Sequence, residues 1–217
     1  MSSWWTQTQD GIVRPGRLIW AYVPHVDQHP FVIVPEGRTD PEDHSSADYR
    51  FQTFKIKNPP PATRLPVAGL PHFQDEVRLV YRAKRRPMLI LSGSGSPVDP
   101  ALRVGAARYQ TNPTILAAPY YSCDSRWNRE FVARIMRCAY SQYMFDYLPI
   151  PGGRESILRL NHVQPIGAHS EAYELTGYCL SAPALAVVEQ QFRWFRQGVL
   201  EKATELFEIR NTLLEDT

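Results

Sequence analysis

Cysteine is scarce in this 217-residue sequence, which contains only three, at positions 123, 138 and 179. A disulfide-stabilised scaffold or a structural zinc site needs cysteines in closely spaced pairs, so this spacing excludes both classes. Widely separated single cysteines are typical of a reducing compartment, and we therefore expect a cytoplasmic location.

Long apolar runs are also missing. No stretch approaches the roughly 20 residues that a membrane-spanning helix needs. The opening residues Met1 to Trp5 have no cationic flank followed by an apolar segment, as a signal peptide would. We expect neither membrane insertion nor secretion. The composition, 43% hydrophobic and 21% charged, is that of a folded protein rather than a disordered one.

The net charge is only +2, so the chain lacks a strong overall charge of either sign. Its basic residues nevertheless cluster, at 82–86 and again along 126–137. A near-neutral protein can bind nucleic acid when its cations converge on one face, because phosphate affinity depends on local Lys and Arg contacts. The alternative is that these clusters are ordinary solvated surface.

Alternating and β-rich segments recur through the first three quarters of the chain and predict strands. Two segments have helical spacing instead: residues 128–145, and the chain from residue 181 onward, which forms one long helix or two helices hinged near Gly198. Residues 36–71 are rich in proline and acidic residues and predict an irregular insertion. The predicted strands cover residues 17–23, 31–34, 49–56, 76–82, 88–91, 114–118 and, as the last, 156–160.

Three of these segments share an unusual arrangement. Pro15-Gly16-Arg17 opens an Ile-Trp strand, Arg86-Pro87 opens an apolar strand after a basic turn, and residues 114–122 form a strand that ends Pro-Tyr-Tyr-Ser. In this order they resemble the MazF/PemK family of bacterial toxins, over residues 14–24, 84–92, 114–122 and 156–199. The resemblance implies a dimeric, SH3-like twisted antiparallel barrel with a C-terminal helix that cuts single-stranded RNA.

The resemblance also implies roles for particular residues. RNA cleavage without a metal needs a base, an acid and a cation that stabilises the charged transition state. Arg86 matches the family's arginine before proline, and its planar guanidinium suits two phosphate oxygens. Arg159 matches a second basic residue on the last strand, and Ser122 matches the hydroxyl that follows the third strand.

The sequence departs from the family at two positions. Tyr121 stands where threonine is common, and Asn161 stands where the family pattern Arg-x-Asp has its acid. Asparagine cannot act as a base, so that role has moved, with His162 as a candidate, or cleavage is lost while binding is kept. His25 and His29 follow the first strand and are candidates for proton transfer, with His25 as the catalytic choice.

We therefore expect a mainly β fold with helices (α+β), an SH3-like barrel spanning residues 1–217 with the 36–71 insertion within it and a C-terminal helical extension at 181–217. The expected function is metal-independent endoribonuclease activity, without cofactors. The alternative is a catalytically degenerate barrel that binds nucleic acid or protein. Expected partners are single-stranded RNA, an antitoxin protein and a second copy of the chain. Expected catalytic residues are Arg86, Ser122, Arg159 and His25, and expected RNA-binding residues are Lys84, Arg85, Tyr121, Asn161, His162 and His29.

Overall fold

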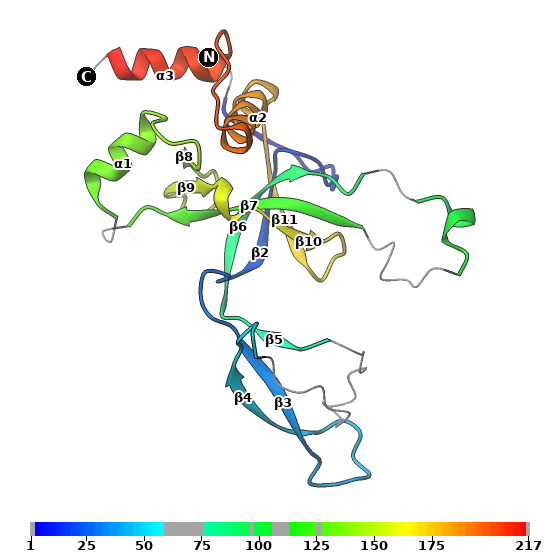
Figure 1. Cartoon of the computed structure of the whole chain (residues 1–217). Helices are drawn as coiled ribbons and strands as arrows, with labels where there is room; N and C mark the ends of the chain where they lie inside the picture. Colours follow the sequence, from blue (N-terminus) through cyan, green and yellow to red (C-terminus); the bar gives the residue numbers. More distant parts are fainter. Residues whose placement is uncertain (1–2, 59–75, 96–97, 106–112, 125–126, 216–217) are drawn as a thin grey trace. The chain divides into compact units, whose positions relative to one another are not determined.

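β-Strands form most of the regular structure, as the sequence predicts, and helices α1 to α3 accompany them (Figure 1). The computed structural model describes residues 3–58, 76–95, 98–105, 113–124 and 127–215. The chain divides into two units. Unit 1 comprises residues 1–22 and 85–217, and unit 2 comprises residues 23–84.

The main sheet belongs to unit 1 and is strongly curled. Its central strand, β7 (Thr114–Ser122), pairs antiparallel with β10 through its first residues, with β6 through its middle and with β9 through its end. β10 and β9 pair with different residues of β7 and share one of its edges end to end, while β6 occupies the other edge. The strand order is β1 (Trp5–Gln7), β11 (Tyr173–Leu180), β2 (Arg17–Pro24), β6 (Ala83–Ser92), β7, β9 (Glu155–Arg159) and β8 (Tyr143–Tyr147), with β10 (Gln164–Gly167) beside β7.

Helix α2 (Ala182–Gln197) packs its apolar stripe against the core of this sheet. The helix begins at Ser181, whose hydroxyl accepts a hydrogen bond from the Ala184 amide, and it ends at Gly198, whose φ of 76° is a left-handed cap. Helix α3 (Glu205–Glu215) follows and buries Leu206 completely. Of the two expected arrangements, one long helix or two helices hinged near Gly198, the structure has the second, with residues 198–204 connecting α2 to α3. Val187 and Val188 of α2 join Leu18, Leu89, Ala118 and Leu158 of the sheet in one core cluster.

The helix predicted over residues 128–145 was too long. Helix α1 spans only Arg129–Met136, is capped by the Asn128 side chain, and stops where Cys138 adopts a φ of 52°. Residues 143–147 form strand β8 instead, because their alternating side chains pair with β9. The prediction that 156–160 is the last strand was also wrong, since β10 and β11 follow it. Short 3-10 turns span Pro100–Arg103 and Leu160–His162.

Unit 2 contains a small sheet of its own. Strand β3 (Phe31–Gly37) lies between β4 (Asp48–Thr53) and β5 (Leu79–Val80), and both pairings are antiparallel. The predicted insertion 36–71 falls within this unit, and its residues 59–71 lie outside the described ranges. None of the helices in the described ranges is long and apolar enough to cross a membrane.

A buried glutamine fastens α2 to the chain that enters β8. Gln191 is fully buried, and its Nε2 atom donates to the carbonyl oxygens of Tyr140 at 2.8 Å, Ser141 at 3.1 Å and Tyr143 at 3.4 Å. We expect Gln191→Leu to lower the free energy of unfolding by about 1–3 kcal/mol, because the carbonyls lose a donor where water cannot replace it. Urea unfolding measures this, with Gln197→Leu at the exposed end of α2 as the control. A leucine variant as stable as the wild type would contradict this role.

Candidate functional site

Sheet register brings Arg86 and Tyr121 together. Strands β6 and β7 pair Met88 with Pro119. Continuing this antiparallel register by two residues places Arg86 opposite Tyr121, with both side chains on one face of the sheet. Pro87 favours an extended conformation at Arg86, because a residue before proline avoids the helical region. The geometry agrees, since the guanidinium carbon of Arg86 lies 4.0 Å from the centre of the Tyr121 ring.

The other neighbour of β7 brings a second arginine to the same ring. Strand β9 pairs Ile157 with Tyr121, and Arg159 follows two residues later on the same face. Strand β8 then places Tyr143 directly opposite Arg159. The guanidinium carbon of Arg159 lies 5.2 Å from the Tyr121 ring centre and 5.7 Å from the Tyr143 ring centre. Both distances are within the range of cation–π attraction.

A histidine completes the cluster. The short turn after β9 places His162 beside β7, and the Tyr121 hydroxyl and His162 Nδ1 are 2.8 Å apart. The two rings meet edge to face, with centres 5.6 Å apart. Which of the two atoms donates depends on the tautomer of His162. In either case the bond fixes the imidazole orientation and directs Nε2 away from Tyr121.

Asn161 supports the second arginine rather than the first. The Nε atom of Arg159 donates to Asn161 Oδ1 at 3.3 Å. An amide oxygen can orient a guanidinium in this way but cannot take up a proton at neutral pH. Asn161 therefore orients Arg159 without offering a base. Arg86, Tyr121, Arg159, His162 and Asn161 are hereafter called the Tyr121 cluster.

The Tyr121 cluster combines positive charge with groups that transfer protons. Two guanidinium groups at one ring concentrate charge where an anion such as a phosphate would be stabilised. The phenol and the imidazole, joined by a hydrogen bond, can pass a proton between them. Within the described residues no group of three His, Cys, Asp or Glu side chains is arranged to hold a metal ion. The two guanidinium groups, the phenol and the imidazole support anion stabilisation with acid–base assistance.

Two predicted residues of unit 1 lie on the other face of their strands. Side chains alternate along a strand, so Ser122 points away from the face that carries Tyr121, and Arg85 points away from the face that carries Arg86. Arg85 instead forms an ion pair with Glu174 and stacks over Trp20, 4.7 Å from the ring centre. The structure thus assembles five of the predicted residues and separates these two from them.

Three other predicted residues belong to unit 2. His25 is partly buried, and its backbone amide donates to the Arg82 carbonyl at 2.8 Å. His29 and Lys84 are exposed. The expectation that His25 or His29 serves the Arg86 site stays a prediction.

Sequence reasoning missed Tyr143, which flanks Arg159. The segment Tyr143-Met144-Phe145-Asp146-Tyr147 alternates aromatic side chains with others, which is a strand signal. It was overlooked because the helical spacing of residues 128–136 was extended through it.

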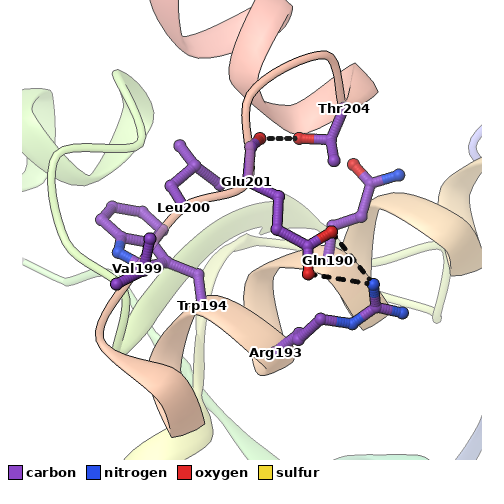
Figure 2. Close-up of a pocket in the computed structure, with 7 residues that line it drawn as sticks. All are labelled: Gln190, Arg193, Trp194, Val199, Leu200, Glu201 and Thr204. Carbon is purple, nitrogen blue, oxygen red and sulfur yellow. Dashed lines mark hydrogen bonds and ion pairs between the residues drawn. The ribbon is translucent and has the colours of Figure 1, made fainter.

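The seam between α2 and α3 contains a small pocket, but its size excludes most ligands (Figure 2). Its volume of about 10 Å³ has room for one water molecule at most. The Arg193–Glu201 ion pair joins α2 to the connecting loop at 3.2 Å, and the Leu206 amide of α3 donates to the Gln190 side-chain oxygen of α2 at 2.8 Å. This seam is a structural junction.

The most buried acid of the described chain is Asp146, which is 8% exposed. Asp146 accepts hydrogen bonds from the Tyr120 hydroxyl at 2.8 Å and from Trp5 Nε1 at 3.2 Å. Burial raises the pKa of Asp146, and these hydrogen bonds oppose that rise. Burial together with the charge of Asp146 raises the pKa of Tyr120. The network fastens the N-terminal strand β1 to the core.

The raised pKa of Asp146 predicts a pH dependence of stability. The folded state binds this proton more tightly than the unfolded state, so the contribution of Asp146 falls as pH rises from about 4 through its folded pKa. Asp146→Asn removes the titration. We expect the unfolding free energy of the variant, relative to wild type, to improve as pH rises from about 4 and to level off above the folded pKa of Asp146. Urea unfolding at stepped pH tests this, and a constant difference would count against it.

Comparison with known proteins adds no relative. No protein-family model, curated protein or solved structure matches this chain.

Proposed function

We propose that this protein is a MazF/PemK-like toxin, a metal-independent endoribonuclease that cuts single-stranded RNA at the Tyr121 cluster on an SH3-like barrel. The observation that carries the proposal is the pair of guanidinium groups at the Tyr121 ring, whose hydroxyl is bonded to His162. The residues that give the sequence its resemblance to the family, Arg86 and Arg159, are the two that meet there.

The chemistry is a transfer within the RNA strand. The 2′-oxygen attacks the adjacent phosphorus while a base removes its proton, and the bond from phosphorus to the 5′-oxygen breaks as an acid protonates that oxygen. The products are a 2′,3′-cyclic phosphate and a 5′-hydroxyl. Arg86 and Arg159 stabilise the negative charge that builds on the phosphate oxygens. His162, oriented by Tyr121, takes the proton-transfer role that Asn161 cannot fill.

The second candidate function is nucleic-acid or protein binding without cleavage. Asn161 favours it, because an amide in the place of the family's acid orients Arg159 without offering a base. The cation pair would still hold a phosphate. The resemblance further implies a homodimer, an antitoxin protein that blocks the cluster, and a cytoplasmic site of action. These partners and this location remain part of the proposal.

Arg86→Ala tests the cation. We expect the cleavage rate of a long single-stranded RNA, assayed in EDTA, to fall roughly 100- to 1,000-fold. The variant lacks the guanidinium group that would stabilise the negative charge on the phosphate oxygens in the transition state. Arg86→Lys keeps the positive charge but cannot contact two phosphate oxygens at once, so its cleavage rate should lie between those of the wild type and Arg86→Ala. Arg196→Ala, an exposed arginine on α2, is the control. Fragments with cyclic phosphate ends that persist in Arg86→Ala would exclude this role. RNA that the wild type binds without cutting would favour the second candidate.

Tyr121→Phe separates the ring from its hydroxyl. The variant keeps the surface on which both guanidinium groups stack but removes the bond to His162. We expect kcat/KM to fall and its pH profile to shift, because the imidazole loses the partner that sets its tautomer and proton affinity. RNA affinity should change little. A lower rate with an unchanged pH profile would assign the hydroxyl a purely structural role.

A further inference from the structure

The small sheet of unit 2 carries three aromatic side chains on one face. Its register pairs Ile33 with Phe51 and Pro35 with Tyr49, while Phe31 pairs with Thr53. Residues directly opposite each other in an antiparallel pair point to the same side, so Phe31, Phe51 and Tyr49 share a face. Phe31 and Phe51 are diagonal neighbours, which places them about 7–8 Å apart. We call these three residues the aromatic face.

The aromatic face is turned to solvent. The exposed fractions are 47% for Phe31, 48% for Tyr49 and 56% for Phe51, whereas Val32 on the opposite face is 1% exposed. The Tyr49 and Phe51 rings meet edge to face, with centres 5.5 Å apart. A single exposed apolar side chain needs no explanation, but three large rings gathered on one face indicate an interaction surface.

Charge is distributed unevenly along this sheet. The hairpin end, where β3 ends and β4 begins, carries the acidic residues Glu36, Asp40, Glu42, Asp43 and Asp48 with Arg38. The opposite end, where β3 begins, is mainly basic. A hydrogen bond from the Phe54 amide to the Pro30 carbonyl brings Lys55 and Lys57 there, and the bond between His25 and Arg82 brings Arg82. Lys55, Lys57 and Arg82 are all exposed, and among the described residues Asp27 is the acid closest in sequence to this end.

We propose that the aromatic face is a stacking platform for the bases of single-stranded RNA, with Lys55, Lys57 and Arg82 contacting its phosphates. The choice of RNA rests on the proposed function. Aromatic rings on an open sheet stack on bases of any sequence, and nearby cations follow the backbone. The uneven charge favours this ligand, because a polyanion is attracted to the basic end and repelled from the acidic hairpin.

A platform of this kind would hold the strand without cutting it. The rings of Phe31 and Phe51 carry no group that could transfer a proton to or from a ribose. Its contribution would be affinity for long substrates, largely independent of base sequence.

The test uses the full chain and a probe that the proposed chemistry cannot cut, a fluorescein-labelled 20-nucleotide 2′-O-methyl RNA. In anisotropy titrations we expect Phe31→Ala/Phe51→Ala to weaken binding roughly 10- to 100-fold. Phe51→Trp should bind the probe with wild-type affinity. Because a base would stack on the new ring, probe binding should quench the tryptophan fluorescence of this variant more than that of the wild type. Tyr147→Ala, at a tyrosine of unit 1 that is 63% exposed, is the matched control and should have no effect.

Several results would overturn the platform. The first is unchanged affinity in the double variant, and the second is Phe51→Trp that binds the probe without added quenching. The quenching experiment decides even where the double variant fails to fold. A wild type that does not bind, but self-associates through Phe31 and Phe51 in sedimentation, would assign the face to a second copy of the chain.

The platform and the nuclease fail separately. Loss of probe binding in the double variant, together with intact RNA in every cleavage assay, would support the platform and reject the nuclease. Cleavage that depends on Arg86, with probe affinity unchanged in the double variant, would support the nuclease and reject the platform.

Discussion

The antiparallel register on both sides of β7 is the constraint on which the candidate site depends. Pairing with β6 brings Arg86 to Tyr121, and pairing with β9 brings Arg159 to the same ring. A slip of one residue in either pairing would turn an arginine to the opposite face of the sheet. The buried residues of the same strands, such as Leu89 and Leu158, fix the register because a slip would also expose them.

Electrostatics also favours an anion at the Tyr121 cluster. The guanidinium groups of Arg86 and Arg159 carry like charges, and both lie at the Tyr121 ring. An anion bound beside them would be attracted by both charges. The sheet register holds the two groups in place, so the site needs no rearrangement to present them.

The sequence predicted the strands that build the site but not all of their neighbours. Strands β2, β6, β7 and β9 were visible because their apolar runs are bounded by proline, glycine or charge. Strand β8 was hidden because helical and strand spacing overlap in a short aromatic segment, and only pairing with β9 decides between them. Arg86 and Arg159 could be singled out from their motifs. Their meeting at Tyr121, and the hydroxyl bond to His162, depend on long-range register that no local pattern contains.

The buried Gln191 gives the C-terminal helix a part in the site. Its amide holds the carbonyl of Tyr143, and the ring of Tyr143 is one of the two surfaces against which Arg159 rests. A displacement of α2 would therefore be transmitted through one glutamine to the second cation, without any contact at the Tyr121 cluster. A partner bound to the outer surface of α2 and α3 could thus change the position of the Arg159 guanidinium at a distance, through Gln191 and Tyr143.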